Sequence, residues 1–460
     1  MPGIRGWIML AGLSCLGAVL VLPAPEGLSP QGWRVSGLAA LMALWWVSEA
    51  VPLAATALLP LALAPLLQIA ELGEVAGAYS DPLILLFLGG FLLARAIEHW
   101  HLHRRIARGL IGLAGQQPGR VLAAVMLATA FLSLWISNTA SAMVMAPIAA
   151  GVAQGREPRF AAALLLGVAF SATIGGIGSL IGTPPNAIFA AYSARVLEVQ
   201  VGFAEWAAVG MPVALVLLVC AWGVLALATP GLRDVAALDL PAQAGPGWSR
   251  GERRLAILAG FTAALWIARP FLERVWPDLP LSDAGIAMAA AVLLFALPAG
   301  QGGRLLDWDT AKGLRWDILI LVGGGLALAG LMDGAGLVDW IGDRVSALEG
   351  LPVVCLVLVI AALIVGLGEL ASNTAMAAIF LPVAGAVAQA MGVEPMQIVL
   401  PVALAASVGF MLPVATPPNA IVFGHDAVNR TAMLKAGAPL DLIGVVVAAG
   451  LGLLLGPLVF

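Results

Sequence analysis

The sequence predicts an all-α polytopic membrane protein with eleven transmembrane helices and two re-entrant hairpins. Its composition, its long apolar segments and an internal duplication support this prediction. Of its 460 residues, 61% are hydrophobic and 10% are charged, whereas soluble domains are about half apolar and about one quarter charged. A soluble fold of this size has too much surface to hide so many apolar side chains.

Eleven apolar segments are long enough to cross the membrane, which takes about 20 helical residues. They cover residues 6–23, 33–50, 52–70, 82–98, 160–195, 205–228, 254–272, 282–300, 316–333, 395–427 and 438–460. Two shorter segments, 99–113 and 336–348, mix charged and apolar side chains. Such amphipathic segments are expected to lie along the membrane interface.

Three short motifs occur twice, at offsets of 235, 233 and 234 residues. An offset this constant indicates one structural unit that is present twice. The pairs are Ser137-Asn138-Thr139 with Ser372-Asn373-Thr374, the hexapeptide Thr-Pro-Pro-Asn-Ala-Ile at 183–188 and 416–421, and Leu88-Gly89-Gly90 with Val322-Gly323-Gly324.

The two polar triplets interrupt apolar segments at 119–153 and 351–391. Each segment is too long for one span, so we expect a hairpin of two half-helices of about 15 residues, each reaching about 22 Å into the membrane. The Pro-Pro pairs remove amide donors and bias the preceding Thr away from helix. The spans at 160–195 and 395–427 are therefore expected to be unwound in the middle.

The motifs divide the chain into a first repeat at 1–228, a cytoplasmic linker at 229–253 and a second repeat at 254–460. The first repeat comprises scaffold helices in 1–98, the interfacial helix 99–113, the hairpin 119–153, the broken helix 160–195 and the helix 205–228. The second comprises scaffold helices in 254–333, the interfacial helix 336–348, the hairpin 351–391, the broken helix 395–427 and the helix 438–460.

The basic residues predict the orientation. With the N-terminus inside, seventeen Lys and Arg residues, among them Arg5, Arg95 and Arg315, lie on the cytoplasmic side and five lie opposite. Cytoplasmic loops of membrane proteins carry such an excess. We therefore expect the first hairpin to open to the cytoplasm, the second to open outward and the C-terminus to lie outside. The two repeats then have inverted topology, in what we expect to be the plasma membrane of a bacterium.

Helices that break inside the membrane supply the polar groups of many secondary transporters. No Lys or Arg occurs in 121–154, 160–194 or 345–429, which cover nearly all of the hairpins and broken helices. Neutral donors alone bind an anion weakly in a low-dielectric site, and a bound cation would add the missing attraction. The pattern predicts cation-coupled anion transport. Glu369, an intramembrane carboxyl group, is either functional or an acceptor for backbone amides.

In these motifs the sequence resembles the divalent anion/sodium symporter family, the INDY-type carriers of dicarboxylates, citrate and sulfate. The resemblance rests on both triplets, on the segment 406–422, and on the segments 45–53 and 56–60. It covers essentially the whole chain. It implies a homodimer in which a mobile transport part moves like an elevator against a scaffold part.

The resemblance also implies binding residues for sodium and substrate. The first sodium site would use Ser133, Ser137, Asn138 and the carbonyl of Gly182. The second would use Asn373 with backbone oxygens of Gly368, Ala371 and Ala415. Substrate carboxylates would meet Asn138, Thr139, Asn373 and Thr374, with Thr183 and Pro417 lining the pocket. Gly368 stands where the family carries a hydroxyl residue, so the sodium stoichiometry stays open.

The function that this pattern favours is sodium-coupled import of a small divalent anion, such as the C4-dicarboxylates succinate or malate. A sodium-independent dicarboxylate exchanger and a sulfate or tricarboxylate carrier are alternatives on the same fold. A cation/proton antiporter or an oxyanion efflux protein is a third, which predicts a buried Asp or Lys at the crossover of the broken helices. The sequence shows no nucleophile–base pair or metal cluster, so an enzyme is not expected.

Overall fold

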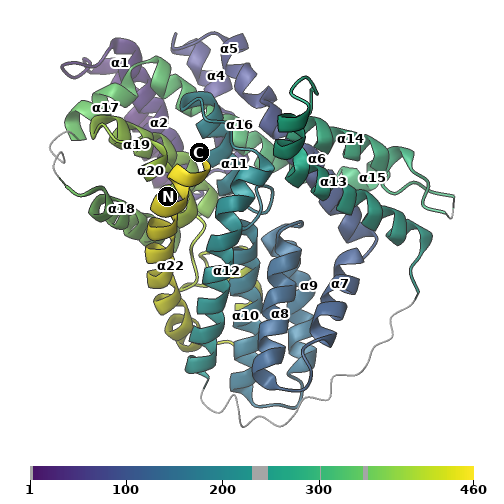
Figure 1. Cartoon of the computed structure of the whole chain (residues 1–460). Helices are drawn as coiled ribbons and strands as arrows, with labels where there is room; N and C mark the ends of the chain where they lie inside the picture. The colour runs from purple at the N-terminus through teal and green to yellow at the C-terminus, as the bar shows by residue number, and fades with distance from the viewer. Residues whose placement is uncertain (1–3, 230–246, 301, 346–350) are drawn as a thin grey trace.

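The computed structural model describes residues 4–229, 247–300, 302–345 and 351–460 (Figure 1). Apart from one isolated bridge between Pro298 and Arg304, its regular structure is helical. The prediction of an all-α membrane protein is confirmed. Most of the predicted linker at 229–253 and the end of the predicted interfacial helix at 336–348 lie outside the described residues.

The helices of the first half follow the order of the predicted segments. They are α1 (Ile4–Val21), α2 (Pro30–Ser48), α3 (Leu53–Thr56), α4 (Leu59–Leu66), α5 (Leu72–Gly77), η1 (Ala78–Ser80), α6 (Pro82–His99), α7 (Leu102–Gly112), α8 (Pro118–Ser133), α9 (Asn138–Val152), α10 (Pro158–Ile177), α11 (Pro184–Val196) and α12 (Phe203–Ala228).

The helices of the second half are α13 (Arg250–Val275), α14 (Asp283–Ala296), α15 (Trp308–Ala311), α16 (Trp316–Gly334), α17 (Leu337–Val345), α18 (Val353–Gly368), α19 (Asn373–Ala390), α20 (Met396–Ala405), α21 (Pro417–Phe423) and α22 (Arg430–Val459). Among them, α16–α22 follow one another in the same order as α6–α12 of the first half.

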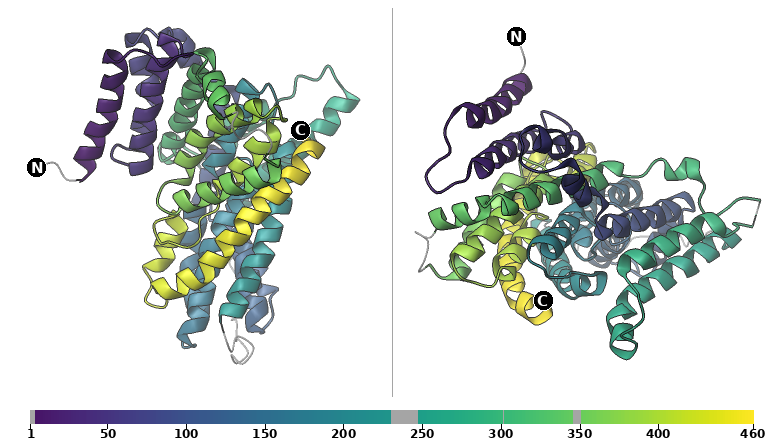
Figure 2. Two further views of the ribbon diagram at one scale, coloured as in Figure 1. Left: turned by 90° about the vertical axis from the view of Figure 1, so that its left-hand side faces the viewer. Right: turned by 90° about the horizontal axis from the view of Figure 1, so that it is seen from above.

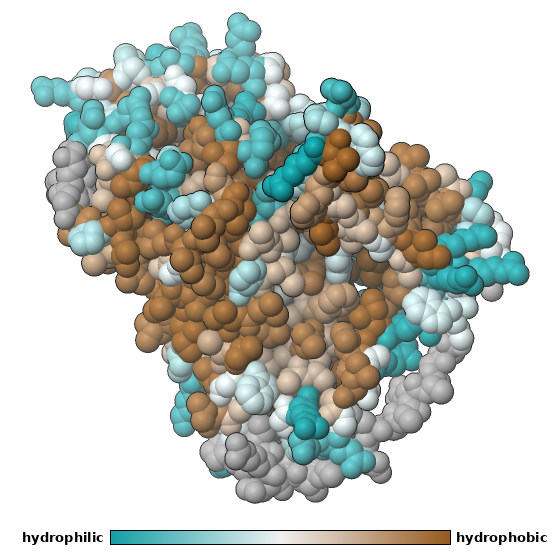
Figure 3. Space-filling view, in the orientation of Figure 1, coloured by the Kyte–Doolittle hydropathy of each residue, from teal (hydrophilic) through white to brown (hydrophobic). Residues whose placement is uncertain are grey.

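Within the described residues, seven helical segments are long and apolar enough to cross a membrane. They are Leu72–His99, Pro158–Ile177, Phe203–Ala228, Arg250–Val275, Trp316–Gly334, Asn373–Ala390 and Arg430–Val459. The space-filling view shows an apolar band between polar ends (Figure 3). Two long helices, α12 and α22, expose large apolar side chains on the molecular surface. These are Leu215, Val216, Val219 and Trp222 on α12 and Leu442, Val446, Leu454 and Leu458 on α22.

The structure differs from the sequence prediction at 52–70, where a single span was expected. The segment forms α3 and α4, with a break at Ala57 and Leu58. Pro60 stands at the start of α4, where its missing amide hydrogen is tolerated. The hydroxyl of Tyr79 donates to the carbonyl of Ala57 at the break. The Ala57 carbonyl thus accepts its hydrogen bond from a distant side chain, whereas in a continuous helix it would accept one from a backbone amide of the same helix.

The two hairpins and the two broken helices pack in the same way in each half. The first broken helix begins with α10, which packs against α8, α9 and α12. In the second half α20 packs against α18, α19 and α22. The halves meet where α12 contacts α22 and where the rings of Phe170 and Phe410 lie edge to face, with centroids 5.4 Å apart. Helix α1 lies at the edge of the molecule against α2 (Figure 2).

Candidate functional site

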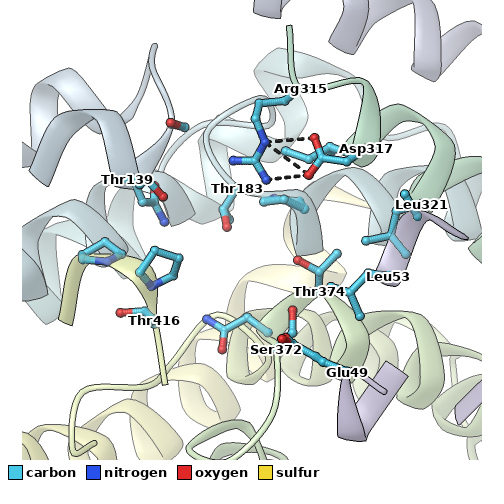
Figure 4. Close-up of a pocket in the computed structure, with 18 of the residues that line it drawn as sticks. Glu49, Leu53, Thr139, Thr183, Arg315, Asp317, Leu321, Ser372, Thr374 and Thr416 are labelled. Carbon is cyan, nitrogen blue, oxygen red and sulfur yellow. Dashed lines mark hydrogen bonds and ion pairs between the residues drawn. The ribbon is translucent and has the colours of Figure 1, made fainter. Parts of the chain in front are cut away.

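One cavity of about 670 Å³ brings the two polar triplets together (Figure 4). The triplets are 235 residues apart in the sequence, and all six of their residues line this cavity. Of the predicted site residues, ten line it: Ser137, Asn138, Thr139, Gly182, Thr183, Ala371, Asn373, Thr374, Ala415 and Pro417. The other two, Ser133 and Gly368, end α8 and α18 and are buried.

Four helices begin at the wall of this cavity. Each triplet provides the start of a half-helix, because α9 begins at Asn138 and α19 at Asn373. The pairs Pro184-Pro185 and Pro417-Pro418 begin α11 and α21 and have no amide hydrogen, so the amide donors at the cavity come from α9 and α19. The first amides of a helix lack partners within the helix and carry partial positive charge, which favours anions. The cavity therefore offers an anion amide donors from both halves of the chain.

The N-caps of the two half-helices differ. The Ser137 hydroxyl accepts a hydrogen bond from the amide of Ala140 at 3.2 Å, as a helix cap does. The side chain of Ser372 makes no capping hydrogen bond. Ser372 lines the cavity, so its hydroxyl is placed where it could meet a ligand.

The Asn side chain of each Thr-Pro-Pro-Asn-Ala-Ile hexapeptide donates hydrogen bonds to backbone carbonyls in and beside the unwound segment that precedes it. The side-chain amide of Asn186 donates to the carbonyls of Gly176 and Ser179, at 2.9 and 2.8 Å. Asn419 is also buried and donates in the same way to the carbonyls of Gly409 and Leu412, at 3.3 and 3.0 Å. The sequence singled out these residues only as part of a repeated motif. Their position directly after Pro-Pro in both copies was the available signal.

Oxygen atoms gather at the predicted first sodium site. The Ser133 hydroxyl lies 2.7 Å from Asn138 Oδ1 and 2.6 Å from the Ala172 carbonyl. A Cβ atom added to Gly182 would lie 2.6 Å from the Gly176 carbonyl and 3.0 Å from the Ser133 carbonyl. One added to Gly176 would overlap Asn138 Oδ1. Oxygens of this kind are the ligands that a hard cation prefers, so these residues fit sodium.

The predicted second sodium site is wider. Asn373 Oδ1 is buried and has no hydrogen-bond partner. A Cβ atom added to Gly368 would lie 3.8 Å from the Val408 carbonyl and 3.9 Å from Asn373 Oδ1. One added to Gly409 would lie 3.5 Å from the Ala415 side chain. An unpaired carbonyl oxygen beside other oxygens fits a cation that completes its coordination.

Glu369 accepts hydrogen bonds from backbone amides, which is one of the two roles expected for it. Its carboxyl oxygens accept from the amides of Met411 and Leu412, at 3.0 and 2.5 Å. The hairpin tip is thereby tied to the unwound segment after α20. A second buried acid, Asp441 on α22, accepts from the amide of Phe410 at 2.9 Å. The sequence did not single out Asp441, because it lies beyond the segments that carry the motifs.

The opposite wall of the cavity carries basic side chains that the motif segments lack. Arg5, Arg95 and Arg315 line it. Arg95 pairs with Glu98 at 2.7 Å, and Arg315 pairs with Asp317 through three hydrogen bonds of 2.8, 2.9 and 3.2 Å (Figure 4). The hairpins and broken helices themselves contain no basic residue at the cavity. Reasoning from those segments alone missed this charged wall.

Comparison with known proteins identifies the family. The sequence profile described as "Sodium:sulfate symporter transmembrane region" matches residues 5–460. The chain belongs to this family. The resemblance to divalent anion/sodium symporters is confirmed.

Two curated relatives carry the name "Sodium-dependent dicarboxylate transporter SdcS". The protein of Staphylococcus saprophyticus is 38% identical over 93% of this chain and 87% of the relative. That of Staphylococcus aureus strain USA300 is 36% identical over 92% of this chain and 86% of the relative. The family member described here therefore aligns with these transporters over nearly its whole length.

Two solved structures share the fold. The YdaH transporter of Alcanivorax borkumensis gives a TM-score of 0.57 at 16% identity, covering 99% of this chain and 97% of that one. MtrF of Neisseria gonorrhoeae, described within a class of antimetabolite efflux pumps, gives a TM-score of 0.59 at 13% identity, covering 99% and 95%. At these identities the likeness shows a transporter fold and nothing about substrate.

Proposed function

We propose that this protein is a secondary active transporter that imports a C4-dicarboxylate, such as succinate or malate, together with sodium ions. The observation that carries the proposal is the meeting of both Ser-Asn-Thr triplets at one cavity. Each triplet stands at the start of a half-helix. The site is thus built from equivalent parts of two repeats.

The arrangement of donors favours an anion with two separate charged groups. Asn138 and Thr139 provide donors from one half, and Asn373 and Thr374 provide them from the other. A dicarboxylate places one carboxylate at each cluster, whereas sulfate concentrates its charge on one compact centre. The names of the curated relatives agree with a dicarboxylate.

Sodium supplies the positive charge that the hairpins and broken helices do not. Ser133, Ser137, Asn138 and Gly182 are proposed for the first ion, and Gly368, Ala371, Asn373 and Ala415 for the second. The triplet asparagines then contribute to both ion and substrate binding. A cation held next to the anion strengthens its binding in a site of low dielectric constant, which couples the two ligands energetically.

The cavity lining supports an inward-facing state. Arg5, Arg95 and Arg315, which line the cavity, all belong to the residues predicted to be cytoplasmic. In the proposed elevator mechanism, α8–α12 and α18–α22 form the mobile part, and helices of 1–98 and 254–333 form the scaffold of a homodimer. The proposed orientation has the N-terminus in the cytoplasm and the C-terminus outside.

Uptake by proteoliposomes tests the proposal. An inward sodium gradient should drive accumulation of labelled succinate, and an equal potassium gradient should not. Excess unlabelled malate should compete strongly and sulfate weakly. Succinate counterflow that is undiminished without sodium on either side would instead show an exchanger. Absence of both sodium-driven uptake and counterflow would overturn the proposed substrate class.

A further inference from the structure

The two cation sites differ at two adjacent residues. The offset of 235 residues that relates the triplets aligns Ser133 with Gly368 and Leu134 with Glu369. Both pairs close the first half-helix of a hairpin, where α8 ends at Ser133 and α18 at Gly368. The first site therefore has a hydroxyl group where the second has none.

The missing hydroxyl leaves an oxygen without a partner. In the first half the Ser133 hydroxyl lies 2.7 Å from Asn138 Oδ1. In the second half the corresponding oxygen, Asn373 Oδ1, is buried with no hydrogen-bond partner. A buried carbonyl oxygen without a donor is unfavourable, so this atom favours a ligand or a water molecule.

The second site also has more room. At Gly176 a Cβ atom would overlap Asn138 Oδ1, whereas at the equivalent Gly409 it would lie 3.7 Å from Asn373 Oδ1. At Gly368 the nearest atom, the Val408 carbonyl oxygen, would be 3.8 Å away from an added Cβ. A Cβ atom at Gly368 would thus make only ordinary van der Waals contacts, and two of the three nearest atoms are oxygens, the Val408 carbonyl and Asn373 Oδ1.

The backbone is held so that this space does not close. Glu369 ties the hairpin tip to the amides of Met411 and Leu412. Leu134, at the equivalent place in the first half, lies against Gly178 through its apolar side chain, where a Cβ on Gly178 would be 2.9 Å from it. The second tip is therefore attached to its unwound segment by hydrogen bonds that fix the distance between them.

We propose that the second sodium ion binds with a water molecule in the place of the missing hydroxyl, so that the protein has one strong and one weak sodium site. The inference rests on the proposed function in that sodium is the bound ion. A water ligand must be immobilised when the ion binds, which a covalently attached hydroxyl avoids. The second ion then sets the sodium concentration at which the carrier is fully loaded.

Sodium titration of purified protein in detergent tests the inference without transport. The melting temperature is measured against sodium concentration, with choline replacing sodium at constant ionic strength. The wild type should respond in two ranges of sodium concentration. Gly368→Ser should shift the weaker range to at least about threefold lower sodium, because it replaces an ordered water. Ser133→Gly should weaken the stronger range.

Two further variants separate a ligand effect from a packing effect. Gly368→Ala adds a methyl group toward the proposed water without adding an oxygen, and it should weaken the second range. Gly366→Ser adds a hydroxyl two residues earlier on the exposed side of α18, where an added Cβ has no atom within 4 Å. It should leave the titration unchanged.

A titration of Gly368→Ser that matches the wild type, or that matches Gly368→Ala, would overturn the water-completed site. A wild type with a single sodium range that Ser133→Gly abolishes would overturn the second sodium site itself. No sodium response in the wild type would overturn sodium coupling, and the inference with it. The first two results leave the proposed transport of a dicarboxylate standing, which distinguishes them from the third.

Discussion

Asn186 and Asn419 make equivalent hydrogen bonds in the two halves of the chain. Each donates its side-chain amide to the carbonyls ten and seven residues before it. Both side chains are buried, and both follow a Pro-Pro pair at the start of a helix. The bonds set the course of the unwound segments that contain Gly182 and Ala415, the residues proposed to contribute backbone oxygens to sodium.

Replacing Asn419 with Asp should therefore weaken both folding and sodium binding. Asp has nearly the same shape, but its carboxyl oxygen cannot donate to the carbonyls of Gly409 and Leu412 unless it is protonated. Leaving such buried carbonyls unpaired costs about 1–3 kcal/mol. Thermal unfolding with and without sodium measures both effects. If sodium raised the melting temperature of this variant as much as that of the wild type, the Asn419 hydrogen bonds would not position the ion ligands.

Adding a methyl group at Gly176 should abolish the first sodium site. The Cβ atom of Gly176→Ala would overlap Asn138 Oδ1, so the oxygen must move away. The expected result is a loss of the sodium-dependent rise in melting temperature at low sodium concentration. Gly151→Ala is the matched control, because an added Cβ there meets no atom within 4 Å. A sodium response at Gly176→Ala like that of the control would contradict the assignment.

Glu369→Gln should loosen the second hairpin tip. The amide nitrogen of Gln cannot accept a hydrogen bond, so one of the two bonds to Met411 and Leu412 is lost. We expect destabilisation of about 1–3 kcal/mol and slower uptake. The exposed Glu394 provides the control, Glu394→Gln. Uptake and unfolding that are the same in both variants would show that these bonds do not hold the tip.

Most of the candidate site could be predicted from the sequence, because the chain contains it twice. The repeated triplets and Pro-Pro pairs mark places where helices must break, and ten of the twelve predicted site residues line the cavity. The other two, Ser133 and Gly368, are buried at the ends of α8 and α18.

The features that the sequence missed depend on contacts between segments that carry no repeated motif. The Tyr79 hydroxyl donates a hydrogen bond to the Ala57 carbonyl at the break between α3 and α4. Asp441 reaches the amide of Phe410 from α22. Arg95 and Arg315 approach the cavity from α6 and from the residue before α16. None of these partners is fixed by local pattern, since each pairing follows from how distant helices pack.

The central claim, that the two triplets form one sodium-coupled dicarboxylate site, is tested most directly by sodium-driven uptake of labelled succinate into proteoliposomes. Asn138→Ala and Asn373→Ala should each abolish uptake while the purified proteins still unfold cooperatively on heating. Ser14→Ala, in the exposed part of α1, is the control and should transport like the wild type. Wild-type uptake by either asparagine variant would contradict the claim.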